Sequence, residues 1–122
     1  RGRCHLGRDR ILMPSPTYQQ YSVTTTLSAG VATDFDIPIN GCTNWQIIVR
    51  NTGATDDVTA ATIATSSLGT LFSAAASITT GIPLAAVTSL GAIVGSSQPC
   101  LTARLTLTST SGTTVAIEMV GS

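Results

Sequence analysis

Apolar and polar side chains alternate with a period of two along several short runs of this sequence, and this pattern constrains the fold more than any other feature. Between positions 101 and 108, leucines and one alanine alternate with threonines and Arg104. Successive side chains of a β-strand point to opposite faces of a sheet, so such a run predicts a half-buried strand. The other runs of this kind are residues 21–27, 31–39, 45–50 and 115–119.

Turn residues separate these runs. Ala29-Gly30 lies between the first two, which suits a hairpin, and Asn40-Gly41 predicts a turn because both residues tolerate positive φ. The turn at 110–112 predicts a C-terminal hairpin in which two strands share one buried face. Arg104 and Glu118 then point outward from that hairpin, and we expect them to lie close to a cross-strand pair of opposite charge.

The middle of the chain is less regular. Residues 58–65 predict a further strand, and Leu68 to Ala76 suits either a short helix or an irregular crossover. Residues 78–94 suggest one or two short strands, with Pro83 at an edge or a bulge. Seven or eight short strands predict an all-β fold, an antiparallel two-sheet β-sandwich of jelly-roll or immunoglobulin-like order that forms one domain over residues 18–122.

The composition indicates a subunit rather than a free monomer. Charged residues make up 10% of the 122 positions and the formal net charge is zero, so little repulsion keeps copies apart. With aromatic residues at 4%, we expect a thin, flat core. The longest apolar stretch, residues 82–95, is too short and too interrupted for a membrane-spanning helix. The N-terminus lacks the pattern of a secretory signal. We therefore expect burial in an assembly, as a homo-oligomer and away from membranes.

Residues 1–17 predict an extended N-terminal arm. Its four cations are Arg1, Arg3, Arg8 and Arg10, which with Asp9 give a net charge of +3 against −3 for the rest of the chain. Paired prolines at 14 and 16 favour an extended conformation between the arm and the body.

Two partners suit this arm. The favoured one is an acidic patch on a neighbouring subunit. The alternative is nucleic acid, because a basic arm neutralises phosphates without reading bases. The sequence also leaves open that Met13 is the natural start and that residues 1–12 are appended.

Residues suited to catalysis are scarce. The chain has one histidine, His5, no lysine, and none of the common nucleophile, metal or phosphate-loop motifs, so we predict no enzyme and no cofactor. The pairs Asp34/Asp36 and Asp56/Asp57 could bind calcium, but their spacing does not match an EF-hand. A solvated strand face and a turn are the favoured interpretations of these carboxylates.

Three cysteines leave two readings open. Cys42 and Cys100 lie in the predicted body and could form a disulfide, with Cys4 of the arm free or paired with another subunit. The favoured alternative is buried free thiols, because an immunoglobulin-like order separates the two cysteines of the body. Cys4-His5 is too small a cluster for zinc.

The run from Ala103 to Met119, together with the threonine-rich and lysine-free body before it, resembles the small β-sandwich structural proteins of tailed phages, of which capsid decoration proteins are the nearest type. The resemblance implies a subunit repeated on a virion, with a terminal arm that engages the shell. The predicted function is therefore a virion structural protein, decorating a capsid or forming its shell. The alternative is an extracellular filament or pilus-like subunit that assembles by strand exchange.

Overall fold

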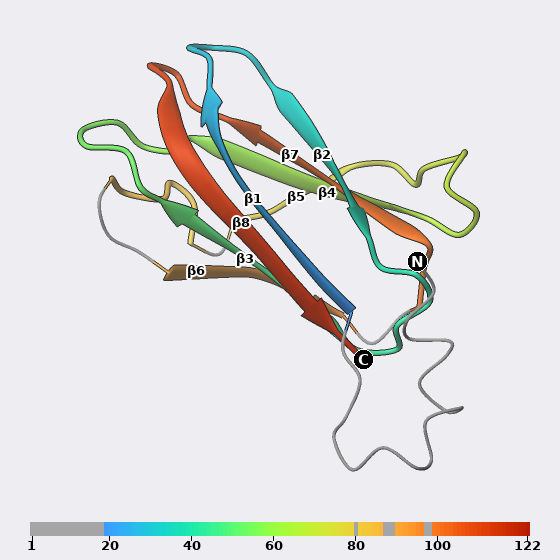
Figure 1. Ribbon diagram of the computed structural model, residues 1–122. Helices are drawn as coiled ribbons and strands as arrows, with labels where there is room; N and C mark the ends of the chain where they lie inside the picture. The colour runs from blue at the N-terminus through green and yellow to red at the C-terminus, as the bar shows by residue number, and fades with distance from the viewer. Residues whose placement is uncertain (1–18, 80, 87–89, 97–98) are drawn as a thin grey trace, which may run out of the picture.

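The chain is described by a computed structural model, which covers residues 19–79, 81–86, 90–96 and 99–122. As predicted, the fold is all-β, with eight strands and no helix in these ranges (Figure 1). No helix of the described ranges is long and apolar enough to cross a membrane. The strands are β1 (Gln19–Leu27), β2 (Thr33–Pro38), β3 (Trp45–Asn51), β4 (Ala60–Ser66), β5 (Ala76–Ser77), β6 (Leu90–Ser96), β7 (Thr102–Thr108) and β8 (Thr113–Gly121).

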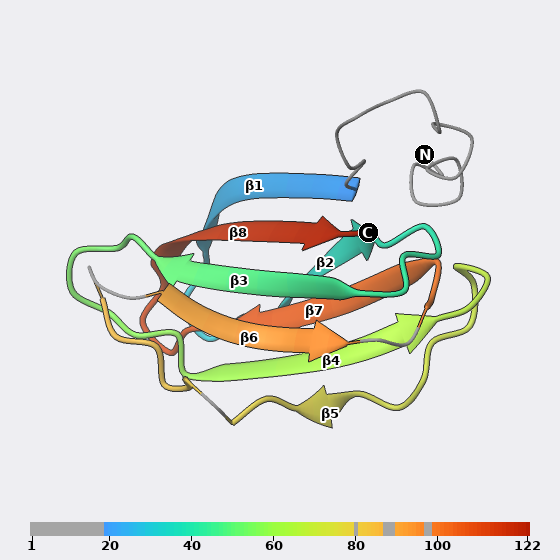
Figure 2. The same ribbon diagram turned by 90° about the horizontal axis from the view of Figure 1, so that it is seen from below.

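The strands form two antiparallel sheets of four, in the orders β1-β8-β3-β6 and β2-β7-β4-β5. Figure 2 shows the two sheets as stacked layers. Apart from β4 and β5, consecutive strands lie in different sheets, so the chain crosses the sandwich repeatedly. This order is that of an eight-stranded jelly roll, which settles the choice between the two predicted sandwich types.

The alternation seen in the sequence sets which face each strand buries. On β3, Trp45, Ile47 and Val49 are buried while Gln46 and Arg50 are exposed, and β7 buries Ala103, Leu105 and Leu107 in the same way. The buried faces of the two sheets pack on each other in one hydrophobic core. This core also includes Phe35 and Ile37 of β2 and Ile117 of β8. Small and aliphatic side chains fill this core, as the composition led us to expect.

The predicted hairpins are wrong. β1 pairs with β8 and β2 pairs with β7, so the first two runs lie in different sheets. β7 and β8 likewise do not pair with each other, and Arg104 and Glu118 lie on opposite outer faces of the molecule. The reason is that a period of two specifies the buried face of a strand but not its neighbour. Two consecutive strands can bury a common core by facing one another as well as by pairing.

Other local predictions fared better. The Asn40-Gly41 turn is confirmed, with φ of 55° and 79°. Residues 67–75 form an irregular crossover and not a helix, and they lead into β5, which is only two residues long. The region from 78 to 94 contributes one longer strand, β6, while Leu84 beyond Pro83 forms an isolated bridge with Val58.

Buried polar side chains tie together one end of the sandwich, called here the closed end: residues 28–32, 52–59, 81–86 and 109–112. The amide of Asn51 is 2% exposed and fully used. Its Nδ2 donates to the carbonyl oxygens of Asp56 (2.8 Å) and Leu84 (3.0 Å), and its Oδ1 accepts from the Gly53 amide (3.0 Å) and the Thr113 hydroxyl (2.8 Å). One side chain thus joins three separate segments.

Ser109 has a similar role at the same end. Its hydroxyl, which is fully buried, donates to the carbonyl oxygen of Asp57 at 2.6 Å and accepts from the Gly112 amide at 3.1 Å. Backbone bonds add to this, since the Gly30 amide donates to the Ser109 carbonyl at 2.8 Å. The loops of the closed end are therefore bonded to one another through the interior.

Candidate assembly surface

The opposite end of the sandwich, called here the open end, comprises residues 39–44, 67–75, 99–101 and the C-terminal Ser122. Backbone bonds join its segments: the Ile39 and Asn40 amides both donate to the Leu101 carbonyl (2.9 Å each), and the Leu101 amide donates to the Ser66 carbonyl (2.9 Å). The C-terminus lies at this end in Figure 1. Three features converge here: a charged cluster, a loop that exposes leucines, and a hollow on the outer sheet face.

The charged cluster lies on the outer face of β2 and β7. Arg104 donates from Nε to Oδ1 of Asp36 at 2.7 Å and from Nη2 to Oδ2 at 3.0 Å, so the pair is bidentate. Asp34 lies 3.9 Å from the Arg104 Nε and accepts a 2.7 Å hydrogen bond from the hydroxyl of Thr106. Hydrogen bonds from Arg104 hold the pKa of Asp36 below its ordinary value, and Asp36 in turn raises the pKa of Arg104.

The carboxylates of this cluster bond to side chains within the cluster. The two aspartates share one strand face as predicted, but they are paired with an arginine and a threonine rather than solvated alone. Across the described ranges, no group of three or more histidine, cysteine or acidic side chains is placed to hold a metal ion. The arrangement serves to fix Arg104 in position.

Arg104 in turn anchors the loop of residues 67–75. Its guanidinium carbon lies 4.1 Å from the centre of the Phe72 ring, a cation–π contact. The Ser73 amide donates to the Thr65 carbonyl at 2.8 Å and the Gly69 amide donates to the Ser66 hydroxyl at 2.7 Å. The loop is therefore held at both ends by bonds to β4 and in the middle by the charged cluster.

Leu68 and Leu71 project from this anchored loop into solvent. They are 80% and 84% exposed, far more than the other exposed large apolar side chains of the described residues. Gly69, with φ of 87°, lies between them and packs so closely on Leu101 that an added Cβ would come within 3.0 Å of it. A fixed loop thus holds two large aliphatic side chains outward, and they have no apolar cover among the described residues.

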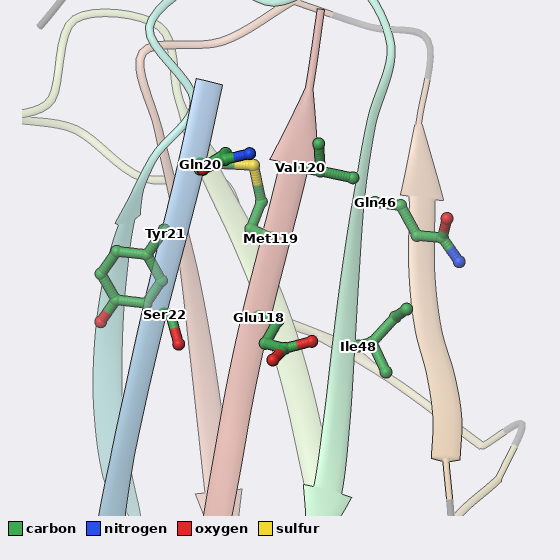
Figure 3. A pocket seen from close by; sticks show the side chains of 8 residues that line it. All are labelled: Gln20, Tyr21, Ser22, Gln46, Ile48, Glu118, Met119 and Val120. Carbon is green, nitrogen blue, oxygen red and sulfur yellow. The ribbon is translucent and has the colours of Figure 1, made fainter. Parts of the chain in front are cut away.

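A shallow hollow lies on the other side of the open end, on the outer face of β1, β8 and β3. It measures about 400 Å³, and Figure 3 shows the residues around it. Ile48 of β3 is directly opposite Glu118 of β8, and Val120 is opposite Gln46. Val120 is 43% exposed, and the side chains of Gln20, Ser22, Gln46 and Glu118 at the rim are also exposed. The hollow thus combines an aliphatic patch with one carboxylate.

Tyr21 lies at the side of this hollow, on β1. Burial, with a smaller contribution from the negative charge of Asp36, raises the pKa of its phenol.

The cysteine predictions are resolved in part. Cys100 is a buried free thiol, whose pKa burial raises, so the Cys42–Cys100 disulfide is wrong. Cys42 is disulfide-bonded, which corrects the favoured reading for that residue. The two segments are neighbours, since the Gly41 amide donates to the Cys100 carbonyl at 2.8 Å, so the expected separation was also wrong. Cys4 lies outside the described residues.

The arm predictions are not tested by the fold. Arg1, Arg3, Arg8 and Arg10, together with His5, precede Gln19 and lie outside the described residues. The arm joins the body at the start of β1, next to Gln20 at the rim of the hollow.

Comparison with known proteins gives no sequence relatives: no family model matches the chain, and no curated protein does. Solved structures do match in fold. VP2 in the subviral particle of infectious bursal disease virus superposes with a TM-score of 0.52 at 14% identity, over 89% of this chain and 35% of VP2. The chain shares its fold with a virus-particle protein. It spans about a third of the length of that VP2 chain.

Bacterial proteins of similar size share the fold as well. A protein from Sulfurospirillum deleyianum matches with a TM-score of 0.53 at 9% identity, covering 85% of this chain and 98% of that one. The mitogen of Yersinia pseudotuberculosis matches at 0.50 and 6%, covering 85% and 86%. A virus-particle protein and bacterial proteins thus share this fold, and the finer resemblance to tailed-phage decoration proteins stays a prediction.

Neither surface of the open end is predicted from the sequence. Leu68 and Leu71 were weighed as one side of a short helix, although Gly69-Thr70 between them breaks such a helix. Glu118 was assigned to a pair with Arg104, which hid its position beside Ile48. The only sequence feature that pointed to an exposed loop was the position of both leucines in a segment with no charged residue and no alternation.

Proposed function

We propose that this chain is a structural subunit of a virus particle, which forms the shell or decorates it and assembles through its open end and its basic N-terminal arm. The observation that carries the proposal is the anchored loop that holds Leu68 and Leu71 in solvent. Burial of two leucine side chains contributes roughly 3 to 6 kcal/mol, which a monomer forgoes and an assembly gains. The jelly-roll fold shared with VP2 supports the same role.

Charge and composition add to this argument. The net charge of zero gives copies no long-range repulsion. The Arg104 cluster has one cation and two carboxylates, so it presents no unpaired cation beside the leucine loop. The partners proposed are copies of this chain or a major capsid protein. For the arm, contact with a neighbouring subunit is favoured over nucleic acid because four arginines without interleaved aromatic residues are few for a packaging arm.

Electron microscopy of material from the native source tests this proposal. Isometric particles that are labelled by an antibody against the chain are the expected result. Particles without label, or label on thin fibres only, would exclude a virion role.

A filament subunit is the second candidate, favoured by one edge of the sandwich. β5 pairs with β4 at only two positions, Thr62 with Ser77 and Ile63 with Ala76, and it is the edge strand of its sheet, so its outer edge has no partner strand within the described residues. An extended segment from another copy could add there as a strand. The same microscopy separates the two candidates, because strand exchange in an open series produces fibres.

A further inference from the structure

We propose that β1 pairs with β1 of a second copy about a two-fold axis, so that two four-stranded sheets join edge to edge into one continuous sheet. β1 is the outermost strand of its layer (Figure 2). This inference rests on the proposed function, in which copies of the chain associate, and it adds the edge of β1 to the surfaces that take part.

The outer edge of β1 offers backbone donors and acceptors to another strand. β1 pairs with β8 along all nine of its residues, and no hydrogen bond within the described ranges reaches the backbone on its other side. Alternate residues of an antiparallel edge strand direct their amide and carbonyl groups away from the partner strand. Such an edge is a template for the addition of a strand.

The other three sheet edges are blunted, whereas β1 is not. β2 carries the carboxylates of Asp34 and Asp36 and ends at Pro38, and β5 is only two residues long. β6 contains two glycines, and its pairing with β3 shifts register between Ile47 and Ile48. Charges, proline, short strands and bulges are features that hinder strand addition, and glycine weakens a strand. β1 contains no charged residue, proline or glycine, and its register with β8 is unbroken.

The inward face of β1 is incompletely covered. Tyr21 and Val23 pack on the core but stay half-buried, whereas their partners on β8, Met119 and Ile117, are buried. Side chains on one face of neighbouring strands contact each other, so a strand added beyond β1 covers both residues. Burial of this apolar area stabilises the pairing in addition to the backbone hydrogen bonds.

The side chains of β1 suit a second β1 as the partner. Its outer row is neutral and exposed, and consists of Gln20, Ser22, Thr24 and Thr26. Antiparallel pairing about Val23, the middle residue, uses the full length of the strand and sets Ser22 of one copy opposite Thr24 of the other. Cross-strand pairs of hydroxyl side chains stabilise a sheet, whereas two β2 strands paired in this way bring carboxylates together.

The two-fold arrangement also limits the size of this contact. Both copies use the same strand, so the pair closes on itself and leaves no further β1 edge. The leucine loop at the open end of each copy stays available for a separate contact.

Matched charge variants of the full-length chain test the pairing. Ser22→Lys with Thr24→Lys, and separately Ser22→Glu with Thr24→Glu, place like charges opposite each other in the paired strands. Each double variant is expected to weaken self-association at least about tenfold, measured by sedimentation velocity. The control is Ser77→Lys with Thr79→Lys, an exposed pair with the same spacing at the β5 edge, which is expected to leave association unchanged. Circular dichroism checks that each variant is folded.

An equimolar mixture of the lysine and glutamate variants identifies the partner. Each β1 then meets opposite charges on the other variant, so association is expected to return as a mixed pair. Loss of association in both variants without recovery in the mixture assigns the edge to a different partner and overturns pairing between copies. Loss in the β5 control alone places the contact at that edge and overturns it as well.

Hydrogen exchange separates strand pairing from contact through the outer face of the sheet. Raising the concentration of the wild-type chain is expected to slow exchange several-fold at the amides of residues 20–26 and to leave residues 33–38 of β2 unchanged, because pairing protects backbone amides. Unchanged exchange along β1 in the associated chain overturns the inference. A wild-type chain whose association depends on Leu68 and Leu71 but not on the β1 substitutions overturns this inference alone, whereas a monomeric wild type overturns the proposed function with it.

Discussion

The two ends of the sandwich place their polar side chains differently, inside at the closed end and on the surface at the open end. At the closed end, Asn51 and Ser109 turn inward, and each bonds backbone groups of the surrounding loops. At the open end, polar and charged side chains stay on the surface and fix a loop whose leucines face water. The difference teaches that the closed end stabilises the fold of one chain, while the leucine contact proposed between chains falls on the open end. Substitutions at the two ends should therefore affect different measurements.

The largest expected effect is at Asn51. Asn51→Ala removes four hydrogen bonds. The Thr113 hydroxyl and the Asp56 carbonyl lose their partner in the interior, and the Gly53 amide and the Leu84 carbonyl each lose one of two bonds. We therefore expect a loss of about 3 to 4 kcal/mol in the free energy of unfolding. Urea denaturation followed by Trp45 fluorescence measures it. Asn44→Ala, an exposed asparagine at the open end, is the control and should change stability by less than about 0.5 kcal/mol. Equal losses of stability in Asn51→Ala and Asn44→Ala would contradict the different roles assigned to the two ends.

Ser109→Ala is expected to cost about 1 to 2 kcal/mol. The variant loses a donor to the Asp57 carbonyl and an acceptor for the Gly112 amide, both part-buried. The same denaturation experiment applies, with the exposed Ser111→Ala as its pair. If Ser109→Ala proved neutral, the closed end would depend on Asn51 alone.

The leucine loop should show the reverse behaviour. Leu68→Ser with Leu71→Ser removes side chains that contact mainly solvent in the monomer, so stability should stay within about 0.5 kcal/mol of wild type. Self-association should weaken about tenfold or more, because the pair is proposed to be buried in the assembly. Val31→Ser replaces an exposed apolar residue of the closed end and should leave association unchanged. Loss of stability without loss of association would contradict the assignment of this loop.

The smallest expected effect is that of low pH on the pair of Asp36 with Arg104. Because the pKa of Asp36 is lowered in the folded chain, the stabilisation from its pair with Arg104 is fully present above the ordinary carboxyl pKa of about 3.9 and is lost as the pH falls through the lowered value. Hydrogen exchange at the amides of Gly69 and Ser73 should then speed up several-fold at low pH relative to other slowly exchanging sites. Arg104→Gln should speed up exchange at these amides at neutral pH and remove the acid dependence.

The sequence predicted the faces of the strands and little of their arrangement. Alternation correctly placed Trp45, Leu105 and Ile117 in the core, because the pleat of a strand fixes which side chains face inward. It could not find that Arg104 pairs with Asp36, 68 positions away, because that depends on which strands become neighbours. The same limit concealed the hollow, whose walls come from β1, β3 and β8.

The leucine loop was unpredictable for a different reason. Residues 67–75 have no periodicity, and their conformation follows from Phe72 resting on Arg104 and from bonds to β4. These are tertiary contacts without a local sequence pattern. Composition alone, with few charges and a net charge of zero, indicated that some surface of the chain is covered in an assembly.

The mass of the purified full-length chain as a function of concentration tests the central claim most directly. Sedimentation equilibrium on a 12.4 kDa chain distinguishes a monomer from any closed assembly. We expect reversible growth to a defined oligomer, with the Leu68→Ser, Leu71→Ser variant shifted toward monomer at every concentration. A wild-type chain that remains a monomer throughout, with no difference from that variant, would contradict the account.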